Sequence, residues 1–186
     1  MRIVGGEFRG RELAAPNSWD IRPSSDRLRE SLFDILIHRY SDRIIGARVL
    51  DLFAGTGALG LEAVSRGAAF ALFVDENVAA RGLIRRNIEA LGLTGRTRIF
   101  RRDATRLGNA GTVSAFDLVF IDPPYGKGLG EKALAAAHVG GWLRPEAICV
   151  LEESGKTAIG AVNHFDEVER RVIGDSQLVF LRPSTG

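Results

Sequence analysis

The chain has 186 residues, of which 45% are hydrophobic and 26% are charged, so it suits one globular domain with little room for a second. No run approaches the roughly 18 apolar residues of a membrane helix, and the first residues lack the apolar core of a signal peptide, so we expect a cytoplasmic protein. A single cysteine, Cys149, excludes an internal disulfide and is expected in the core. The net charge is only +2, but the basic residues are 22 arginines and three lysines, which permits a polyanionic partner.

The first 45 residues predict a small extension in front of the main domain. Residues 2–13 alternate apolar and polar side chains around glycines, which is typical of a β-hairpin or flap. A loop at 16–23 follows, after which Ser24, Ser25 or Asp26 can cap a helix that continues to about Tyr40. We therefore divide the chain into an extension, residues 1–45, and a main domain, residues 46–186.

From residue 48 onward strands and helices alternate, a pattern typical of a parallel sheet covered by helices. We expect strands at 48–53, 69–75, 97–101, 116–121 and 147–152, and helices at about 60–66, 77–91 and 131–140. Two β-rich runs, 168–173 and 177–181, are separated by a turn-forming segment and predict an antiparallel pair at the sheet edge. The expected fold is an α/β, doubly wound, mostly parallel sheet of seven strands.

A glycine-rich turn follows the first predicted strand of this domain. Gly55, Gly57 and Gly60 have the spacing of a dinucleotide-binding loop, and Asp75 ends the next strand 20 residues after Gly55. Glycines let the backbone approach a ligand closely, and an acid at this distance can accept hydrogen bonds from ribose hydroxyls. The alternative is a tight turn with a capping acid, but the strand context and the spaced acid favour an adenosine cofactor.

Further acids bear on which adenosine cofactor binds. Asp51 lies near the end of the first strand, where a carboxylate can receive the cationic methionine end of S-adenosylmethionine but would repel a pyrophosphate. We therefore prefer S-adenosylmethionine to a nicotinamide cofactor. Asp103 and Ala104 follow the third strand, where an adenine amino group would lie, and a surface turn is the alternative interpretation.

The fourth predicted strand ends abruptly in Asp122-Pro123-Pro124-Tyr125. Proline lacks the N–H that a sheet needs, so the strand stops at Asp122. A carboxylate, a fixed carbonyl and an aromatic ring suit a planar molecule with an amino group, such as a nucleobase, although a stiff turn is an alternative. Ligands of open α/β sheets bind at the carboxyl ends of the strands, so we expect the cofactor and the base to face each other there.

These segments resemble the RsmD-type bacterial methyltransferases, which modify the exocyclic N2 amine of a guanine in 16S ribosomal RNA and belong to the Rossmann-like class of S-adenosylmethionine-dependent enzymes. The glycine loop is common to many methyltransferases, and Asp-Pro-Pro-Tyr to enzymes that methylate amino groups of bases. The N-terminal segments are the specific part. Thr56 stands where the family often has serine. The resemblance is carried by residues 2–6, 9–11, 22–30, 51–63 and 122–125.

The resemblance implies a monomeric enzyme that needs no metal and acts on 16S ribosomal RNA within an assembling small ribosomal subunit. It implies a catalytic base site at Asp122, Pro123, Pro124 and Tyr125. It implies cofactor contacts at Asp51, Phe53, Ala54, Gly55, Thr56, Gly57, Asp75, Asp103 and Ala104. The N-terminal arginines expected to contact RNA phosphates, with a solvated surface as the alternative, are Arg9, Arg11, Arg22, Arg27 and Arg29.

Other functions stay open at this point. Asp-Pro-Pro-Tyr suits the N6 amine of adenine in RNA or DNA as well as the N2 amine of guanine. The glycine loop also fits an NAD-dependent oxidoreductase, and a non-catalytic RNA-binding protein could keep the same fold.

Overall fold

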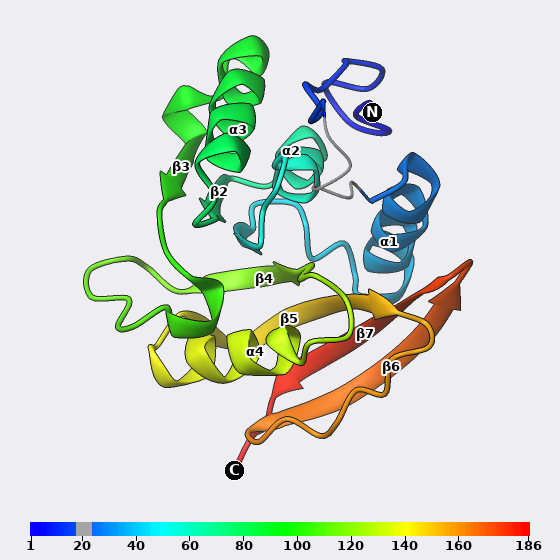
Figure 1. The fold of residues 1–186 in the computed structure, drawn as a ribbon, viewed down its shortest axis with the longest axis vertical. Coiled ribbons are helices and arrows are strands. Elements are labelled where there is room, and N and C mark those ends of the chain that lie inside the picture. The colour runs from blue at the N-terminus through cyan, green and yellow to red at the C-terminus, as the bar shows by residue number, and fades with distance from the viewer. Residues whose placement is uncertain (18–23) are drawn as a thin grey trace.

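The described residues of this computed structural model, 1–17 and 24–186, form a layered α/β structure around a seven-stranded sheet (Figure 1). The strands are β1 (Arg48–Leu52), β2 (Phe70–Val74), β3 (Thr97–Phe100), β4 (Phe116–Ile121), β5 (Leu143–Ser154), β6 (Phe165–Ile173) and β7 (Ser176–Pro183). Their order is β3-β2-β1-β4-β5-β7-β6. The first five in this order are parallel, and β7 is antiparallel to both its neighbours, which confirms the predicted sheet and its antiparallel edge.

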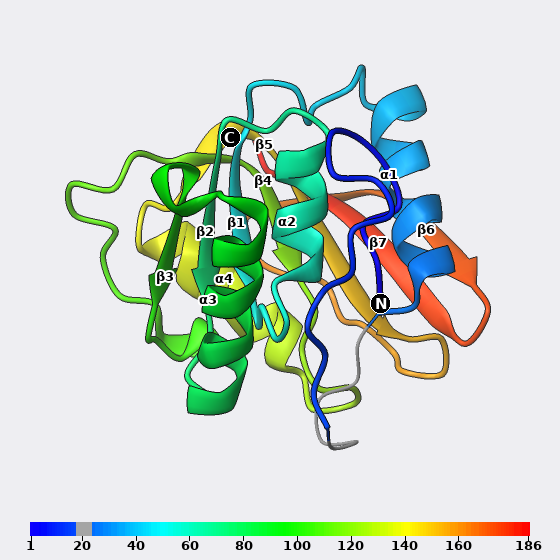
Figure 2. The ribbon, with the colours of Figure 1, turned by 90° about the horizontal axis from the view of Figure 1, so that it is seen from above.

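Helices cover both faces of the sheet. One face carries α1 (Asp26–Arg39), α2 (Ala58–Ser65) and α3 (Val78–Leu91), which pack on strand side chains such as Phe73 and Phe120. The other face carries α4 (Leu129–Val139), which packs near Trp142 and the buried Cys149. Figure 2 shows α4 on the opposite side of the sheet from α1, α2 and α3. Short 3-10 turns, η1 (Thr94–Arg96) and η2 (Ala104–Arg106), flank β3.

Burial on both faces explains the unbroken apolar runs of the central strands. In β4, Leu118 and Phe120 face the α1 side, whereas Val119 and Ile121 face the α4 side. β5 is longer than the predicted 147–152 because both ends find partners. Leu143 pairs with β4 beyond a register shift, and Ser154 pairs with β7.

Residues 1–14 form a loop that docks on α2 and α3 (Figure 2). The predicted hairpin is represented by an antiparallel bridge between Arg2 and Glu12 and by local backbone hydrogen bonds. Both carboxylate oxygens of Glu62 on α2 lie 3.1 Å from the Val4 nitrogen. Asn87 on α3 accepts the Ala14 N–H at 2.7 Å and donates to the Thr56 carbonyl at 3.0 Å. The loop is therefore tied to the glycine turn after β1.

The helix α1 belongs to the main hydrophobic core. Ser25 caps it by accepting the Leu28 N–H at 3.1 Å. Its Phe33 ring lies 5.6 Å from that of Phe120, and Tyr40 stacks on Phe180 with centroids 5.2 Å apart. Residue 45, where we placed the end of the extension, therefore follows a helix that shares one core with the sheet. Within the described part of the chain, no helix is both long and apolar enough to span a membrane.

Candidate active site

The carboxyl ends of β1, β2, β4 and β5 surround a cavity of about 910 Å³. In the sheet, β1 lies between β2 and β4. The chain adds β2 and β3 on one side of β1 and then β4 and β5 on the other, so the strand order reverses at β1. The cavity lies at this point, which is the usual ligand site of doubly wound sheets. The predicted site residues that line it are Asp51, Phe53, Ala54, Gly55, Thr56, Asp75, Asp103, Ala104, Asp122, Pro123, Pro124 and Tyr125. Their individual roles in binding stay predictions.

The glycine turn is built by close packing beneath the cavity. Gly57 has φ +80° and is the N-cap of α2, so it turns the chain into the helix. It is not among the residues that line the cavity. A Cβ at Gly60 would lie 2.5 Å from the Phe73 ring, so a side chain there would push α2 off the sheet. Phe53 has φ +56°, a conformation that costs a non-glycine residue roughly 1–3 kcal/mol and is often found at functional sites. The local sequence thus fixes a strained bend at the cavity wall.

Asp51 holds the start of α2 from inside the structure. It is 1% exposed, and its Oδ2 accepts the Gly60 N–H at 3.0 Å. Burial raises the pKa of this carboxyl to about 8, and the nearby charge of Asp75 adds to the shift, whereas the Gly60 hydrogen bond opposes it. A cationic group in the cavity would favour the charged form of Asp51.

Acids at the ends of β2 and β3 are held by neighbouring backbone groups. Asp75 accepts the Gly55 N–H at 2.9 Å through Oδ2 and the Asn77 N–H at 2.9 Å through Oδ1. Asp103 accepts the N–H and the hydroxyl of Thr105 at 2.9 and 2.7 Å. These contacts fix both carboxylates at the cavity wall, with little rotamer freedom left to lose when a ligand binds.

Asp122 directly follows β4 on the opposite wall of the cavity, where the Ser24 hydroxyl donates to its Oδ2 at 3.1 Å. The same hydroxyl lies 3.0 Å from Glu152 Oε2 at the end of β5. Burial raises the pKa of the Asp122 carboxyl well above its usual range, and the charge of Glu152 raises it further. The two acids thus form a closely coupled pair beside the proposed base site.

Tyr125 lines the cavity and directs its hydroxyl toward the second of these acids. The hydroxyl donates to Glu152 Oε1 at 2.7 Å and lies 3.1 Å from the Ser176 hydroxyl. Burial and the Glu152 charge raise the pKa of Tyr125, so the phenol stays protonated as a donor. The ring is half-buried and lines the cavity, as a stacking surface for a base requires.

Several residues of the cavity wall were not predicted from the sequence. Glu152 ends a predicted strand beside β4, so its position resembles that of Asp122 and could have been recognised. The sequence predicts Ser24 as a possible helix cap, but nothing in its local sequence indicates its contact with an acid 98 residues away. The missed lining residues are Ser24, Ser25, Leu28, Ala58, Leu59, Val74, Glu76, Asn77, Ala80, Arg102, Thr105, Leu129, Glu152 and Ser176.

The N-terminal arginines occupy different environments. Arg9, Arg11 and Arg27 are exposed, and Arg11 donates from Nη2 to the Ala90 carbonyl on α3 at 2.8 Å. Arg22 lies outside the described residues. The exposed members therefore remain candidates for phosphate contacts.

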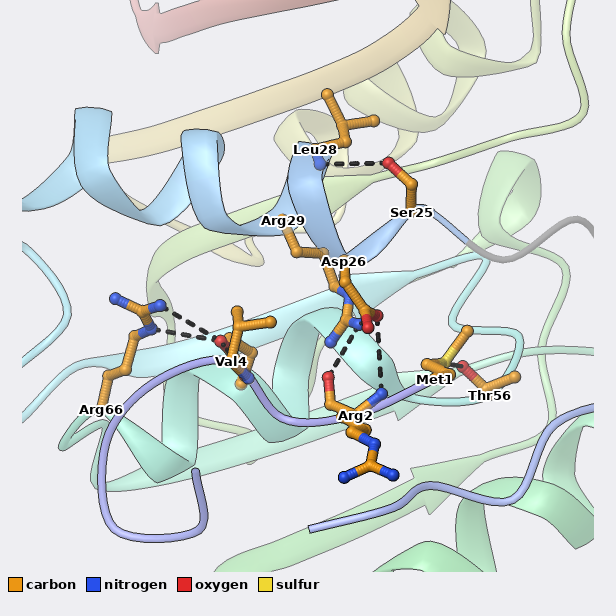
Figure 3. Close-up of polar contacts among 10 residues, drawn as sticks. Met1, Arg2, Val4, Ser25, Asp26, Leu28, Arg29, Thr56 and Arg66 are labelled. Atoms are coloured by element: carbon orange, nitrogen blue, oxygen red, sulfur yellow. Dashed lines mark hydrogen bonds and ion pairs between the residues drawn. The ribbon is translucent and has the colours of Figure 1, made fainter. Parts of the chain in front are cut away.

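Arg29 was predicted to be an exposed RNA contact, and the structure shows that this is wrong. Its side chain is fully buried, forms an ion pair with Asp26, and donates from Nη2 to the Arg2 carbonyl at 2.9 Å (Figure 3). The loop of residues 1–14 passes over this face of α1 and covers a position that would otherwise be solvated. Arg29 therefore ties the N-terminal loop to α1 and cannot contact an RNA phosphate in this conformation.

The cavity suits S-adenosylmethionine by the chemistry of its walls. Asp51, Asp75 and Asp103 lie at the ends of three adjacent strands, so acceptors are available for a cationic amino-acid end, ribose hydroxyls and an adenine amine.

The chain is similar over most of its length to known protein sequences. A family model described as "Conserved hypothetical protein 95" matches residues 1–182. Ribosomal RNA small subunit methyltransferase D of Escherichia coli (strain K12) is 38% identical over 163 residues, which cover 87% of this chain and 79% of that protein. The putative rRNA methyltransferase YlbH of Bacillus subtilis (strain 168) is 40% identical over 127 residues, 67% of each chain.

Solved structures show the same arrangement of elements. The putative methyltransferase yhhF from Escherichia coli superposes with a TM-score of 0.82 at 32% sequence identity, covering 98% of this chain and 97% of that one. A hypothetical protein of Thermus thermophilus has a TM-score of 0.75 at 32% identity, covering 97% and 98%. The similarity therefore includes the N-terminal segment as well as the sheet.

Proposed function

The chain belongs to the RsmD-type family of S-adenosylmethionine-dependent methyltransferases, and on this premise we propose that it methylates the exocyclic N2 amine of a guanine in 16S ribosomal RNA. We further propose that the enzyme acts as a monomer on an assembling small ribosomal subunit. The observation that carries the proposal is the single cavity that contains both the glycine turn and the Asp122–Tyr125 segment.

The walls of the cavity divide into a cofactor side and a base side. Asp51, Asp75 and Asp103 would hold S-adenosylmethionine, which supplies a methyl group activated by its sulfonium charge. Asp122 and Tyr125 lie on the other wall, beyond the end of β4. Holding two reactants in one orientation is itself a large part of the rate enhancement in such enzymes.

Asp122 is the proposed group that activates the amine. The lone pair of an exocyclic amine is delocalised into the ring, so the nitrogen is a poor nucleophile. If the Asp122 carboxylate accepts one N–H and the Pro123 carbonyl accepts the other, the nitrogen becomes more pyramidal and its lone pair is aimed across the cavity. These hydrogen bonds strengthen as positive charge develops on nitrogen, so they stabilise the transition state more than the bound substrate.

Tyr125 and the N-terminal segment would hold the RNA. The ring of Tyr125 is proposed to stack on the target base after it leaves its strand, as enzymes that modify bases require. Three exposed arginines lie near the start of α1: Arg9 and Arg11 precede it in the chain, and Arg27 is in its first turn. The same turn contributes Leu28 to the cavity wall. Phosphate contacts by these arginines would place the RNA over the opening.

The alternative functions differ in how far they are supported. The names of the relatives indicate methyltransferases acting on ribosomal RNA, so they do not favour an NAD-dependent oxidoreductase. Asp-Pro-Pro-Tyr by itself suits adenine N6 as well as guanine N2, so the choice between these amines is part of the proposal.

The proposed function can be tested by transfer of labelled methyl from S-adenosylmethionine to small-subunit particles that lack the modification, followed by nucleoside analysis. The expected product is N2-methylguanosine at one position. Asp122→Ala should lower the transfer rate by a factor of about 100 or more while S-adenosylmethionine still binds. Asp166→Ala, which removes an exposed acid on β6, is the matched control and should keep the wild-type rate. Labelled adenosine, or no transfer by the wild-type protein, would refute the proposal.

A further inference from the structure

Glu152 is a second carboxylate at the proposed base site. It is 5% exposed near the end of β5, and β5 pairs with β4, which is followed directly by Asp122. Tyr125 donates its hydroxyl to Oε1 at 2.7 Å, and the Ser24 hydroxyl lies 3.0 Å from Oε2. These contacts from two different segments fix the direction of the Glu152 carboxylate beyond the hydroxyl end of the Tyr125 ring.

The Ser24 hydroxyl shows what kind of group fits between the two acids. Its oxygen lies 3.1 Å from Asp122 Oδ2 and 3.0 Å from Glu152 Oε2, so it lies within hydrogen-bonding distance of two acceptors at once. A hydroxyl has one hydrogen to donate, however, and can satisfy one acceptor at a time. A group that presents two adjacent N–H donors would match this pair of carboxylates better than the hydroxyl does.

Guanine presents such a pair of donors, and adenine does not. The Watson–Crick edge of guanine carries the N1–H directly beside the N2 amine, whereas the edge of adenine carries the N6 amine beside N1, which is an acceptor. We propose that Glu152 selects guanine over adenine by accepting the N1–H of the target base while Asp122 accepts a hydrogen of its N2 amine. The base edge would replace Ser24 between the two acids.

Adenine would be rejected by an unfavourable contact. With its N6 amine at Asp122, its N1 lone pair would face the Glu152 carboxylate with no hydrogen between them. Sites built to bind a particular donor commonly discriminate by large factors, because the analogue leaves a buried polar group unpaired. Glu152 would thus supply the choice of base that Asp-Pro-Pro-Tyr alone leaves open.

This inference rests on the proposed function, so its experiment starts from particles in which the methylated guanine has been located. The guanine is replaced by 2-aminopurine, which keeps the N2 amine but has no N1–H, or by 6-thioguanine, which keeps both and changes position 6. Wild-type protein should methylate 2-aminopurine at least tenfold more slowly than guanine, and 6-thioguanine at a rate much closer to guanine.

The variant Glu152→Gln should reverse this preference. The glutamine side chain can still accept from Tyr125 through its oxygen, and its amide N–H can donate to the N1 acceptor of 2-aminopurine. The ratio of the guanine rate to the 2-aminopurine rate should fall to about one or below. Glu153→Gln is the matched control: Glu153 is also buried, accepts the Gly126 N–H at 3.0 Å and does not line the cavity, so the wild-type ratio should persist.

Each result decides the inference. Equal wild-type rates on guanine and 2-aminopurine would overturn it without any variant, so it stays testable even if Glu152→Gln fails to fold. A Glu152→Gln protein that binds S-adenosylmethionine normally but keeps the wild-type ratio would overturn the role of Glu152. Absence of guanine methylation in the unsubstituted particle would instead refute the proposed function, and it is seen before any analogue is used.

Discussion

Asp51 is buried where its negative charge is unfavourable, so the free energy of unfolding should depend on pH through this group. Burial raises its pKa from 3.8 to about 8. The folded protein therefore holds a proton that the unfolded chain releases near pH 4. The protonated, neutral form of Asp51 is the one that suits the folded protein, so the stability that depends on this proton is fully present below about pH 4. It is lost as the pH rises toward 8.

Asp51→Asn should remove this loss of stability at rising pH, because an amide carries no charge and its oxygen can still accept the Gly60 N–H. We expect the free energy of unfolding to fall less between pH 5 and pH 8 in the variant than in the wild type, as measured by denaturant titration. S-adenosylmethionine affinity should fall roughly 10–100-fold, the loss of a hydrogen bond to a charged group. Parallel pH profiles would show that Asp51 is not the buried group responsible.

Asp122 gives a second pH-dependent prediction, for the reaction rate. It must be ionised to accept an amine hydrogen, and its pKa is raised by burial first and by the charge of Glu152 second, with Asp51 adding and the Ser24 hydrogen bond opposing. The plot of kcat/KM against pH should therefore have an ascending limb, and the midpoint of this limb should lie above the usual pKa range of carboxyl groups. In Glu152→Gln one of these charges is absent, so the limb should move to lower pH. An unchanged limb would mean that another group controls the rate.

At the scale of single elements, the N-terminal loop combines attachment to the fold with an exposed basic surface. Glu62 and Asn87 hold its backbone, while Arg9 and Arg11 remain exposed. A surface of this kind can contribute to RNA binding through phosphate contacts without any part in the chemistry. Such contacts reveal themselves by their dependence on salt, because each one releases counterions from the RNA.

Replacing both Arg9 and Arg11 with alanine should weaken RNA binding and reduce the slope of log affinity against log salt by roughly 1 to 2. The affinity for S-adenosylmethionine should not change. The double variant Arg43→Ala/Arg144→Ala is the control, since these residues lie near the amino ends of β1 and β5, away from the cavity. RNA binding measured at several salt concentrations decides the matter, and an unchanged slope for the Arg9 and Arg11 variant would contradict the proposed surface.

The elements themselves were largely predictable because their local sequences agree with their environments. Strands buried on both faces give continuous apolar runs, so β1, β2 and β4 were found within one residue at each end. Arg29 was misjudged for the opposite reason. Its helix shows a polar residue beside an apolar stripe, and its burial depends on the loop of residues 1–14, which the helix sequence does not reveal.

At the scale of the whole molecule, the site was predictable as far as the parallel sheet determines it. Asp51 lies near the carboxyl end of β1, and Asp75 and Asp122 follow β2 and β4, so their meeting at one edge of the parallel sheet follows from the fold. The contact of Ser24 with Glu152, 128 residues away, depends instead on how α1 packs against the sheet. No local pattern encodes that packing, so the Ser24 contact with Glu152 is not predictable from the sequence, although the position of Glu152 at the end of a strand beside β4 is.

The same packing predicts that residues 1–45 cannot be removed from the protein. Their loss would expose Phe120 and Phe180 and take Phe33 and Tyr40 from the core. At roughly 1.5–3 kcal/mol for each buried large side chain, the loss would approach the total stability of a typical domain. The fragment of residues 46–186 should therefore fail to unfold cooperatively in denaturant titrations.

Two point variants show how much stability a buried and an exposed side chain of α1 should each contribute. Phe33→Ala in the full chain should lower the free energy of unfolding by about 3–5 kcal/mol, because its side chain is completely buried. Arg39→Ala on the same helix should cost less than about 1 kcal/mol, because the Arg39 side chain is exposed and Glu169 keeps its ion pair with Arg171. A 46–186 fragment that unfolds cooperatively and binds S-adenosylmethionine would show instead that the sheet and its remaining helices are a self-sufficient domain, with α1 an accessory to RNA binding alone.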